Sequence, residues 1–223
     1  NCYKIKLTAA LLGLPLATRQ YDILAGETRT PEFLANVNPN GRIPAIIDHA
    51  PGDGGEPVTV FESGAVLLYL AEKAGRFLPT DLRGQSRVRQ GLFWQVGPLG
   101  PTLGQHGHFH LYAEEKLPYA IERFHREALR VYSVMDRRLG QSEYLAGNDY
   151  SVADMACFPW VRTWKAQGIP LAEYAHVKRW YDALKRREGL RRGVSLGSDL
   201  ARRGEMTEEQ RKNLFGTAQA RVQ

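Results

Sequence analysis

The sequence has few cysteines and no long apolar run. Only two of its 223 residues are cysteine, Cys2 and Cys157, and two cysteines cannot form the disulfide framework that staples small secreted domains. The apolar stretch 65–71 is far shorter than the roughly 20 residues that a membrane-spanning helix requires. We therefore expect a cytoplasmic protein without a membrane partner, in which any thiol chemistry is catalytic.

The composition is that of a globular chain, and its charge is unevenly distributed. Hydrophobic residues make up 43% and charged residues 24%, with a mean hydropathy of -0.39, which excludes a disordered or collagen-like chain. Up to Arg76 there are 7 Lys and Arg against 8 Asp and Glu, and beyond it there are 23 against 16. This change from neutral to basic predicts two units.

The first 76 residues alternate helix and strand signals. A helix is expected from the first residues to Gly13, because glycine and the following proline end helices. Thr30 and Pro31 begin a short second helix as N-cap and first helical residue. Apolar spacing adds three strands and a third helix. The strands are residues 19–24, 43–47 and 58–61, the last two forming a hairpin, and the helix opens at 62–64.

Beyond residue 81 the pattern predicts helices alone, broken by glycine and proline clusters. The expected helices are residues 85–96, 118–139, 151–167 and 176–187. Ser151 and Asp154 have the spacing of a capping box, which we interpret as a folding signal. The segment 195–223 is polar and basic, with a weak helical pattern at 207–214.

Two short segments carry candidate binding chemistry. Pro44 enters a strand after a loop and is a candidate cis bond, which would expose the Ile43 backbone to an extended ligand. The free N–H groups at the helix start beside Ser63 and Gly64 form an anion site. Glu62 adds a negative charge beside it. This arrangement suits the zwitterionic head group of an amino acid, although a capped helix with an exposed acid explains the same residues.

Several motifs in order resemble the cytosolic glutathione transferases. They are residues 38–45 (NPNGRIPA), 61–63 (FES) and 150–154 (YSVAD). Three further segments, 92–97, 100–105 and 118–123, are similar to the bacterial Nu-class branch of glutathione-dependent disulfide-bond oxidoreductases. The resemblance extends from Asn1 to about Gly189.

This resemblance implies a fold, a cofactor and a partner. The fold is an α/β thioredoxin-like glutathione-binding domain over residues 1–76, followed by an all-α helical domain over 84–194 and a basic tail over 195–223. Glutathione would be the bound co-substrate, and the chain would pair as a homodimer. The resemblance further implies one strand ahead of Asn1, so we expect roughly ten more residues in front of it in the intact protein.

The same resemblance assigns residues to the site. Glu62 and Ser63 would hold the γ-glutamyl group, the Ile43 backbone the cysteinyl unit, and Arg42 the glycyl carboxylate. Arg123 matches an arginine of this branch that reaches glutathione, whereas Thr28 occupies a position where the branch often has a glutamine or histidine, and its short hydroxyl reaches less far. Asn1 matches the signature asparagine, whose amide N–H would act with the positive end of the first helix to stabilise a glutathione thiolate.

Other candidate groups receive weaker support. Cys2 in a first helical turn is a rival catalyst, whereas Cys157 in an apolar helix is expected to be inert. The alternating residues His106, His108 and His110 fall in what we interpret as a loop between helices, and we expect no metal site. The basic clusters near residues 185–192 lack the motifs of a nucleic-acid partner.

The sequence therefore favours an enzyme of the glutathione transferase type. The leading hypothesis is a glutathione-dependent disulfide-bond reductase that uses the bound glutathione thiolate as nucleophile. Conjugation of glutathione to small electrophiles is the first alternative. A non-catalytic glutathione-binding regulatory module is an alternative of another class.

Overall fold

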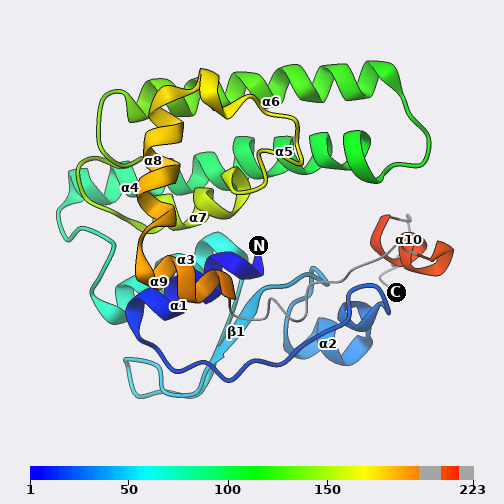
Figure 1. Ribbon diagram of the computed structural model, residues 1–223. Coiled ribbons are helices and arrows are strands. Elements are labelled where there is room, and N and C mark those ends of the chain that lie inside the picture. Colours follow the sequence, from blue (N-terminus) through cyan, green and yellow to red (C-terminus); the bar gives the residue numbers. More distant parts are fainter. Residues whose placement is uncertain (196–206, 216–223) are drawn as a thin grey trace.

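A small α/β unit and a larger helical unit follow one another along the chain (Figure 1). The computed structural model describes residues 1–195 and 207–215. The predicted boundaries of the units, 1–76 and 84–194, stay predictions, and most of the predicted tail, residues 196–206 and 216–223, lies outside the described residues.

The elements of the α/β unit begin and end close to where the sequence predicts them. Helix α1 (Cys2–Leu12) ends at Gly13, whose φ of 69° is left-handed. The Thr30 hydroxyl accepts a 3.3 Å hydrogen bond from the Phe33 N–H and caps α2 (Pro31–Asn36). Strands β1 (Ala45–Asp48) and β2 (Val58–Phe61) pair antiparallel, with Ala45 opposite Phe61. Helix α3 (Ser63–Ala74) follows directly.

The strand expected at residues 19–24 was a wrong prediction. Residues 15–20 are exposed and without regular structure, and in the described part of the chain β1 and β2 pair only with each other. A strand without a neighbour leaves its backbone groups unpaired. The Asp22 carboxylate instead accepts the N–H groups of Leu24 and Ala25, at 2.8 and 3.2 Å, and forms a local turn.

In the part of the chain that the structure describes, seven α-helices follow α3; the first six form the helical unit, and the last, α10, lies outside it. They are α4 (Leu82–Trp94), α5 (Gly100–Gly107), α6 (Pro118–Leu139), α7 (Val152–Val161), α8 (Ala175–Lys185), α9 (Glu188–Ser195) and α10 (Glu208–Phe215). The predicted helices at 118–139 and 176–187 are confirmed. The one predicted at 151–167 ends earlier, at Val161.

The break expected near Gly97 and the loop expected at His106–His110 were also wrong. Two π-helical turns, Gln95–Leu99 and His108–Tyr112, keep the chain helical from α4 through α5. The wider π turn accommodates Pro98, which has no N–H to donate. Gly100 packs closely there, because a Cβ atom at this position would lie 2.7 Å from the Gln95 Nε2 atom and 3.1 Å from the Gln95 carbonyl oxygen.

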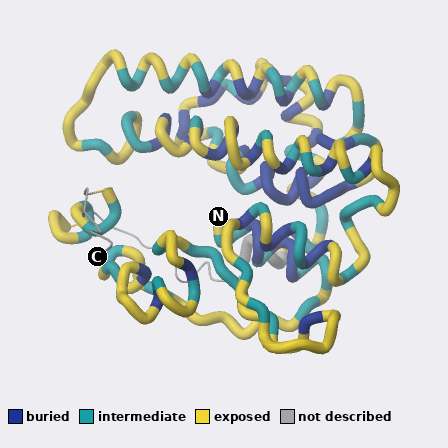
Figure 2. The backbone as a smooth tube through the Cα atoms, turned by 180° about the vertical axis from the view of Figure 1, so that it is seen from behind, coloured by how far each residue is buried: buried dark blue, intermediate teal, exposed yellow. Residues whose placement is uncertain are grey.

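Helix α1 joins the two units. It packs against α3 on one side and against α7 and α9 of the helical unit on others. Figure 2 shows buried residues concentrated where these helices meet, and Leu7, Leu67 and Val152 are fully buried there. Gly189 of α9 lies so close that a Cβ atom on it would be 2.4 Å from the Leu11 side chain. One apolar core therefore runs through both units.

Helix α10 lies away from this core, beside both units. The Asn213 amide donates a 2.7 Å hydrogen bond to the Leu24 carbonyl, and Arg211 pairs with Glu114 at 2.6 Å. This helix confirms the pattern predicted at residues 207–214. Within residues 1–195 and 207–215, no helix combines the length and the apolar character that spanning a membrane would require.

The predicted capping box at the start of α7 is confirmed, and its Asp154 also binds groups outside this helix. The Asp154 carboxylate accepts hydrogen bonds from the backbone N–H of Ser151 and Leu145 and from the Trp180 indole, at 3.1, 3.0 and 2.8 Å. Asp154 is fully buried, and burial raises its pKa. The Asp154 side chain thus links α7 to the loop that contains Leu145 and to α8.

We expect Asp154→Ala to lower the free energy of unfolding by about 3 kcal/mol, because it leaves several buried donors without an acceptor. Asp182→Ala, which removes an exposed ion pair with Lys178, should cost less than about 1 kcal/mol. Urea denaturation of both variants measures the difference. Equal losses would contradict the proposed role of Asp154.

Candidate functional site

A polar cavity lies where the start of α1, the loop before β1 and the start of α3 meet. Its volume is about 300 Å³. The lining residues are Asn1, Asn38, Asn40, Arg42, Ile43, Pro44, Glu62 and Ser63. Five of the seven predicted site residues therefore line one cavity: Asn1, Arg42, Ile43, Glu62 and Ser63.

The loop before β1 is shaped by Asn38. The Ile43–Pro44 peptide bond is cis, as predicted. The Asn38 side chain is only 1% exposed; its amide donates to the Arg42 carbonyl at 2.8 Å and its oxygen accepts the Asn40 N–H at 2.9 Å. Asn38 thereby fixes the backbone on both sides of Gly41. The sequence motif included this residue, but without assigning it to the site.

The start of α3 provides donors beside a carboxylate. The first hydrogen bond of this helix runs from the Val66 N–H to the Glu62 carbonyl, so the N–H groups of Ser63 and Gly64 precede the intrahelical ladder. The Glu62 side chain is exposed and accepts a 3.3 Å hydrogen bond from the Asn40 amide. The cavity thus offers positive helix-end potential and a negative charge side by side.

Gly64 brings this helix end close to the helical unit. A Cβ atom at Gly64 would lie 3.3 Å from the Val96 side chain, which follows α4. The cavity therefore lies at the boundary between the two units.

Asn1 and Cys2 differ in their relation to the cavity. Asn1 is exposed at the N-cap of α1, and its side chain makes no capping hydrogen bond, so its amide is available to a ligand. Cys2 is half-buried and is not one of the lining residues. Cys157 is fully buried in α7, and burial raises the pKa of its thiol well above the ordinary value, which disfavours the reactive thiolate.

Two predicted residues lie outside the cavity lining. Thr28 is buried in a 3₁₀ turn behind the loop, and its carbonyl would be 3.2 Å from a Cβ atom on Gly41. Arg123 is exposed on α6. The structure brings neither side chain to the cavity wall, and their contacts with a ligand stay predictions.

Lys4 is a cavity neighbour that the sequence did not single out. Its side chain is 1% exposed, and its ammonium donates to the Ser63 hydroxyl at 3.1 Å and to the Gln95 amide oxygen at 2.5 Å. Burial lowers the pKa of Lys4 to about 8, while the nearby Cys157 and Glu62 act in the opposite direction. Lys4 lies among the apolar residues of a predicted helix. Because long cationic side chains usually extend to solvent, its position in the sequence does not indicate that it is buried beside the cavity.

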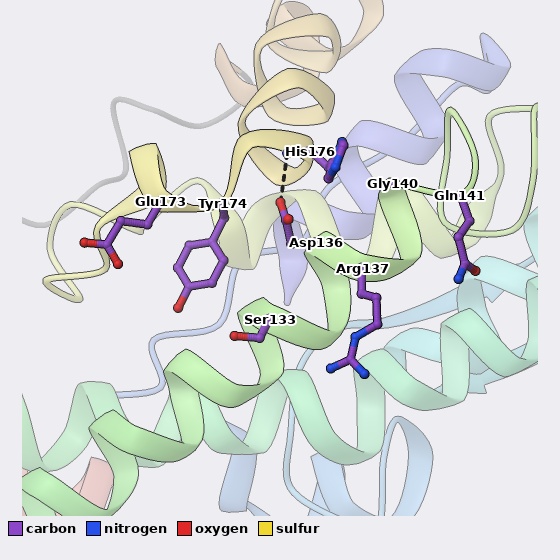
Figure 3. A pocket seen from close by; sticks show the side chains of 8 residues that line it. All are labelled: Ser133, Asp136, Arg137, Gly140, Gln141, Glu173, Tyr174 and His176. Carbon is purple, nitrogen blue, oxygen red and sulfur yellow. Dashed lines mark hydrogen bonds between the residues drawn. The ribbon is translucent and has the colours of Figure 1, made fainter.

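A second, wider hollow of about 560 Å³ lies between α6 and α8 (Figure 3). The Asp136 carboxylate in it accepts the backbone N–H groups of His176 and Val177, at 2.8 and 3.0 Å. Asp136 thus caps the first turn of α8. None of the predicted site residues lines this hollow, and its central carboxylate already has a structural role.

The three alternating histidines also have structural surroundings. His106 is buried and its Nε2 atom lies 2.8 Å from the Gln167 carbonyl, and burial lowers its pKa. Its ring stacks on His110 at 5.3 Å. In the part of the chain that the structure describes, no group of three or more His, Cys, Asp or Glu is arranged to hold a metal ion.

Comparisons with known proteins agree with this architecture. Residues 1–73 match the family description "Glutathione S-transferase, N-terminal domain", and residues 118–183 match "Glutathione S-transferase, C-terminal domain". The disulfide-bond oxidoreductase YfcG of Escherichia coli (strain K12) is 49% identical over 187 residues, which cover 84% of this chain and 86% of the relative.

Two solved structures are similar over most of the chain. A glutathione transferase from Burkholderia graminis, with two glutathione molecules bound per subunit, is 35% identical with a TM-score of 0.81, covering 91% of this chain and 85% of the other. A glutathione transferase from Pseudomonas putida, with one glutathione disulfide bound per subunit, is 31% identical with a TM-score of 0.81, covering 87% and 86%. The predicted fold class is confirmed.

The buried Lys4 makes stability depend on pH. Its pKa is about 8 in the folded protein against an ordinary 10.5, so between these values the unfolded chain binds more protons and stability rises with pH. Relative to Lys4→Met, the native protein should gain about 2 kcal/mol of unfolding free energy from pH 7.5 to pH 10. Denaturant titrations at several pH values measure this change.

Thr8→Val is the control, because Thr8 is buried on the same helix and does not titrate. Its difference from the native protein should stay constant over this range. A constant difference for Lys4→Met as well would show that Lys4 is not buried as a cation.

Proposed function

The chain belongs to the glutathione S-transferase family, and from that premise we propose that it is a glutathione-dependent disulfide-bond reductase. The observation that carries the proposal is the polar cavity at the boundary of the two units, which combines an acid, a helix start and a cis-proline loop. The similarity to a disulfide-bond oxidoreductase over most of both chains supports the reaction class.

The cavity suits the parts of glutathione in order. The carboxylate of the γ-glutamyl group would bind at the Ser63 hydroxyl and the first N–H groups of α3, and its ammonium at Glu62. The Ile43 backbone before Pro44 would pair with the cysteinyl unit, and the Arg42 guanidinium would reach the glycyl carboxylate. Thr28 and Arg123 would contact glutathione from outside the cavity lining. A volume of about 300 Å³ is at the small end of ligand pockets, which fits a tripeptide partly exposed to solvent.

Asn1 is the proposed catalytic residue. Its amide N–H would donate to the glutathione sulfur, and the positive end of α1 would add to the stabilisation of the thiolate. Both effects lower the pKa of the bound thiol and increase the thiolate fraction at neutral pH.

The proposed reaction is two thiol–disulfide exchanges. The bound thiolate attacks one sulfur of a small disulfide, forms a glutathione mixed disulfide and releases the other half as a thiolate, which takes up a proton. A second glutathione then attacks the mixed disulfide through its thiolate. The products are glutathione disulfide and the fully reduced substrate. No metal is needed for either exchange.

We propose that the protein is a homodimer in the cytoplasm and that it has no nucleic-acid or membrane partner. Exposed apolar side chains on and after α4, Phe93 at 64% and Val96 at 37%, support an interface on that face. Light scattering coupled to size exclusion should give twice the chain mass of 25.1 kDa.

Conjugation to small electrophiles is the second candidate function, because the same glutathione site serves it. A non-catalytic glutathione-binding module is a further alternative within the fold. Parallel assays of 2-hydroxyethyl disulfide reduction and 1-chloro-2,4-dinitrobenzene conjugation separate the three. We expect disulfide reduction to dominate; conjugation without reduction would contradict the proposal, and glutathione binding with neither activity would favour the module.

We expect Asn1→Ala to lower kcat/KM for disulfide reduction by roughly tenfold to a hundredfold, since one charge-assisted hydrogen bond to the thiolate is lost. Cys2→Ser should keep nearly full activity, because Cys2 does not line the cavity. Steady-state kinetics with purified variants measure both effects. Loss of activity in Cys2→Ser, with Asn1→Ala fully active, would transfer the catalytic role to the Cys2 thiol.

A further inference from the structure

Lys4 is a buried cation whose partners are neutral. Its ammonium donates to the hydroxyl of Ser63 and to the amide oxygen of Gln95. Among the ion pairs of residues 1–195 and 207–215, none includes Lys4. A buried ammonium without a carboxylate lowers stability. An apolar side chain would fill this position at lower cost, so packing alone does not account for a lysine here.

The hydrogen bond from Lys4 determines what Ser63 can do. A lysine ammonium has three donors and no acceptor, so the Ser63 oxygen accepts and the hydroxyl hydrogen is left to point elsewhere. Ser63 is 8% exposed and lines the cavity. Its hydroxyl is therefore prepared to donate into the cavity, toward an anion.

Gln95 keeps the ammonium in place from the helical unit. Gln95 is 1% exposed at the start of the first π turn, and its amide nitrogen lies 2.7 Å from where a Cβ atom of Gly100 would be. Gly100, which has no Cβ atom, therefore leaves room for the Gln95 side chain beside it. The second hydrogen-bond acceptor of the Lys4 ammonium thus comes from a residue of the other unit.

The residue next to Ser63 in the cavity lining carries the opposite charge. The Glu62 carboxylate faces the cavity and is oriented by the Asn40 amide at 3.3 Å. Cys157 of α7 and Glu62, the residue before α3, are titratable groups whose charges act on Lys4. The cavity is therefore polarised, positive behind Ser63 and negative at Glu62.

We propose that Lys4 is a positioning residue that makes the site selective for a free α-carboxylate on the γ-glutamyl group of its ligand. It holds the Ser63 hydroxyl as a donor toward that carboxylate and supplies the charge that offsets it. This inference rests on the proposed function, in which a γ-glutamyl group binds here.

The test compares two ligands that differ only at this carboxylate. S-methylglutathione, which has no ionisable thiol, and its derivative with an α-carboxamide on the γ-glutamyl group are titrated by calorimetry at pH 7, where Lys4 is charged. Lys4→Met should weaken binding of S-methylglutathione by roughly tenfold or more, the loss expected for a charge-assisted interaction. Binding of the carboxamide should change by less than about threefold.

Controls separate this role from a structural one. Thr8→Val removes a hydroxyl that donates to the Lys4 carbonyl at 2.8 Å and should leave both affinities unchanged. Lys4→Gln, which keeps a neutral donor, should reproduce the selective loss and serves if Lys4→Met does not fold. An equal loss for both ligands, or no loss for either, overturns the inference alone. Failure of the native protein to bind S-methylglutathione overturns the proposed function with it.

Discussion

The contact on which the rest of the structure depends is the junction of α1 with both units. One face of α1 packs on α3 beside the cavity, and others pack on α7 and α9. The buried Lys4 lies in this junction and links Ser63 of the cavity wall to Gln95 of the helical unit. Because the same helix carries Asn1 at its start, the position of the proposed catalytic amide and that of the anion site are set by one packed element.

The site combines buried residues that are hydrogen-bonded within the protein with exposed residues that can contact a ligand. Asn38, Lys4 and Gln95 are each 1% exposed, and each makes side-chain hydrogen bonds within the protein. Asn1, Arg42 and Glu62 are exposed on the cavity side. A buried inner layer that orients an outer, ligand-facing layer is the arrangement that precise substrate positioning requires. In the proposed reaction the protein contributes little covalent chemistry, since glutathione brings the reactive thiol.

Local signals explain which parts were predictable from sequence. Gly13, Thr30 and the Ser151–Asp154 pair act on neighbouring backbone groups, so their patterns were sufficient. The segment 19–24 was misassigned because a strand needs a partner that sequence periodicity does not report. A break after the predicted helix 85–96 was wrong because π turns, which depend on packing, have no composition signal. Local chemistry singled out Ile43, Glu62 and Ser63, and the family resemblance added Asn1 and Arg42. Lys4 was missed because its burial arises only where three helices meet.

The central claim is that the cavity binds glutathione with its sulfur at Asn1 and its γ-glutamyl carboxylate at Ser63. A crystal structure of the protein with glutathione bound tests this most directly. The account predicts the sulfur within hydrogen-bond distance of the Asn1 amide, the α-carboxylate on the Ser63 hydroxyl with Lys4 behind it, and the ammonium at Glu62. A ligand bound in the reverse orientation, or with its sulfur at Cys2 and away from Asn1, would contradict it.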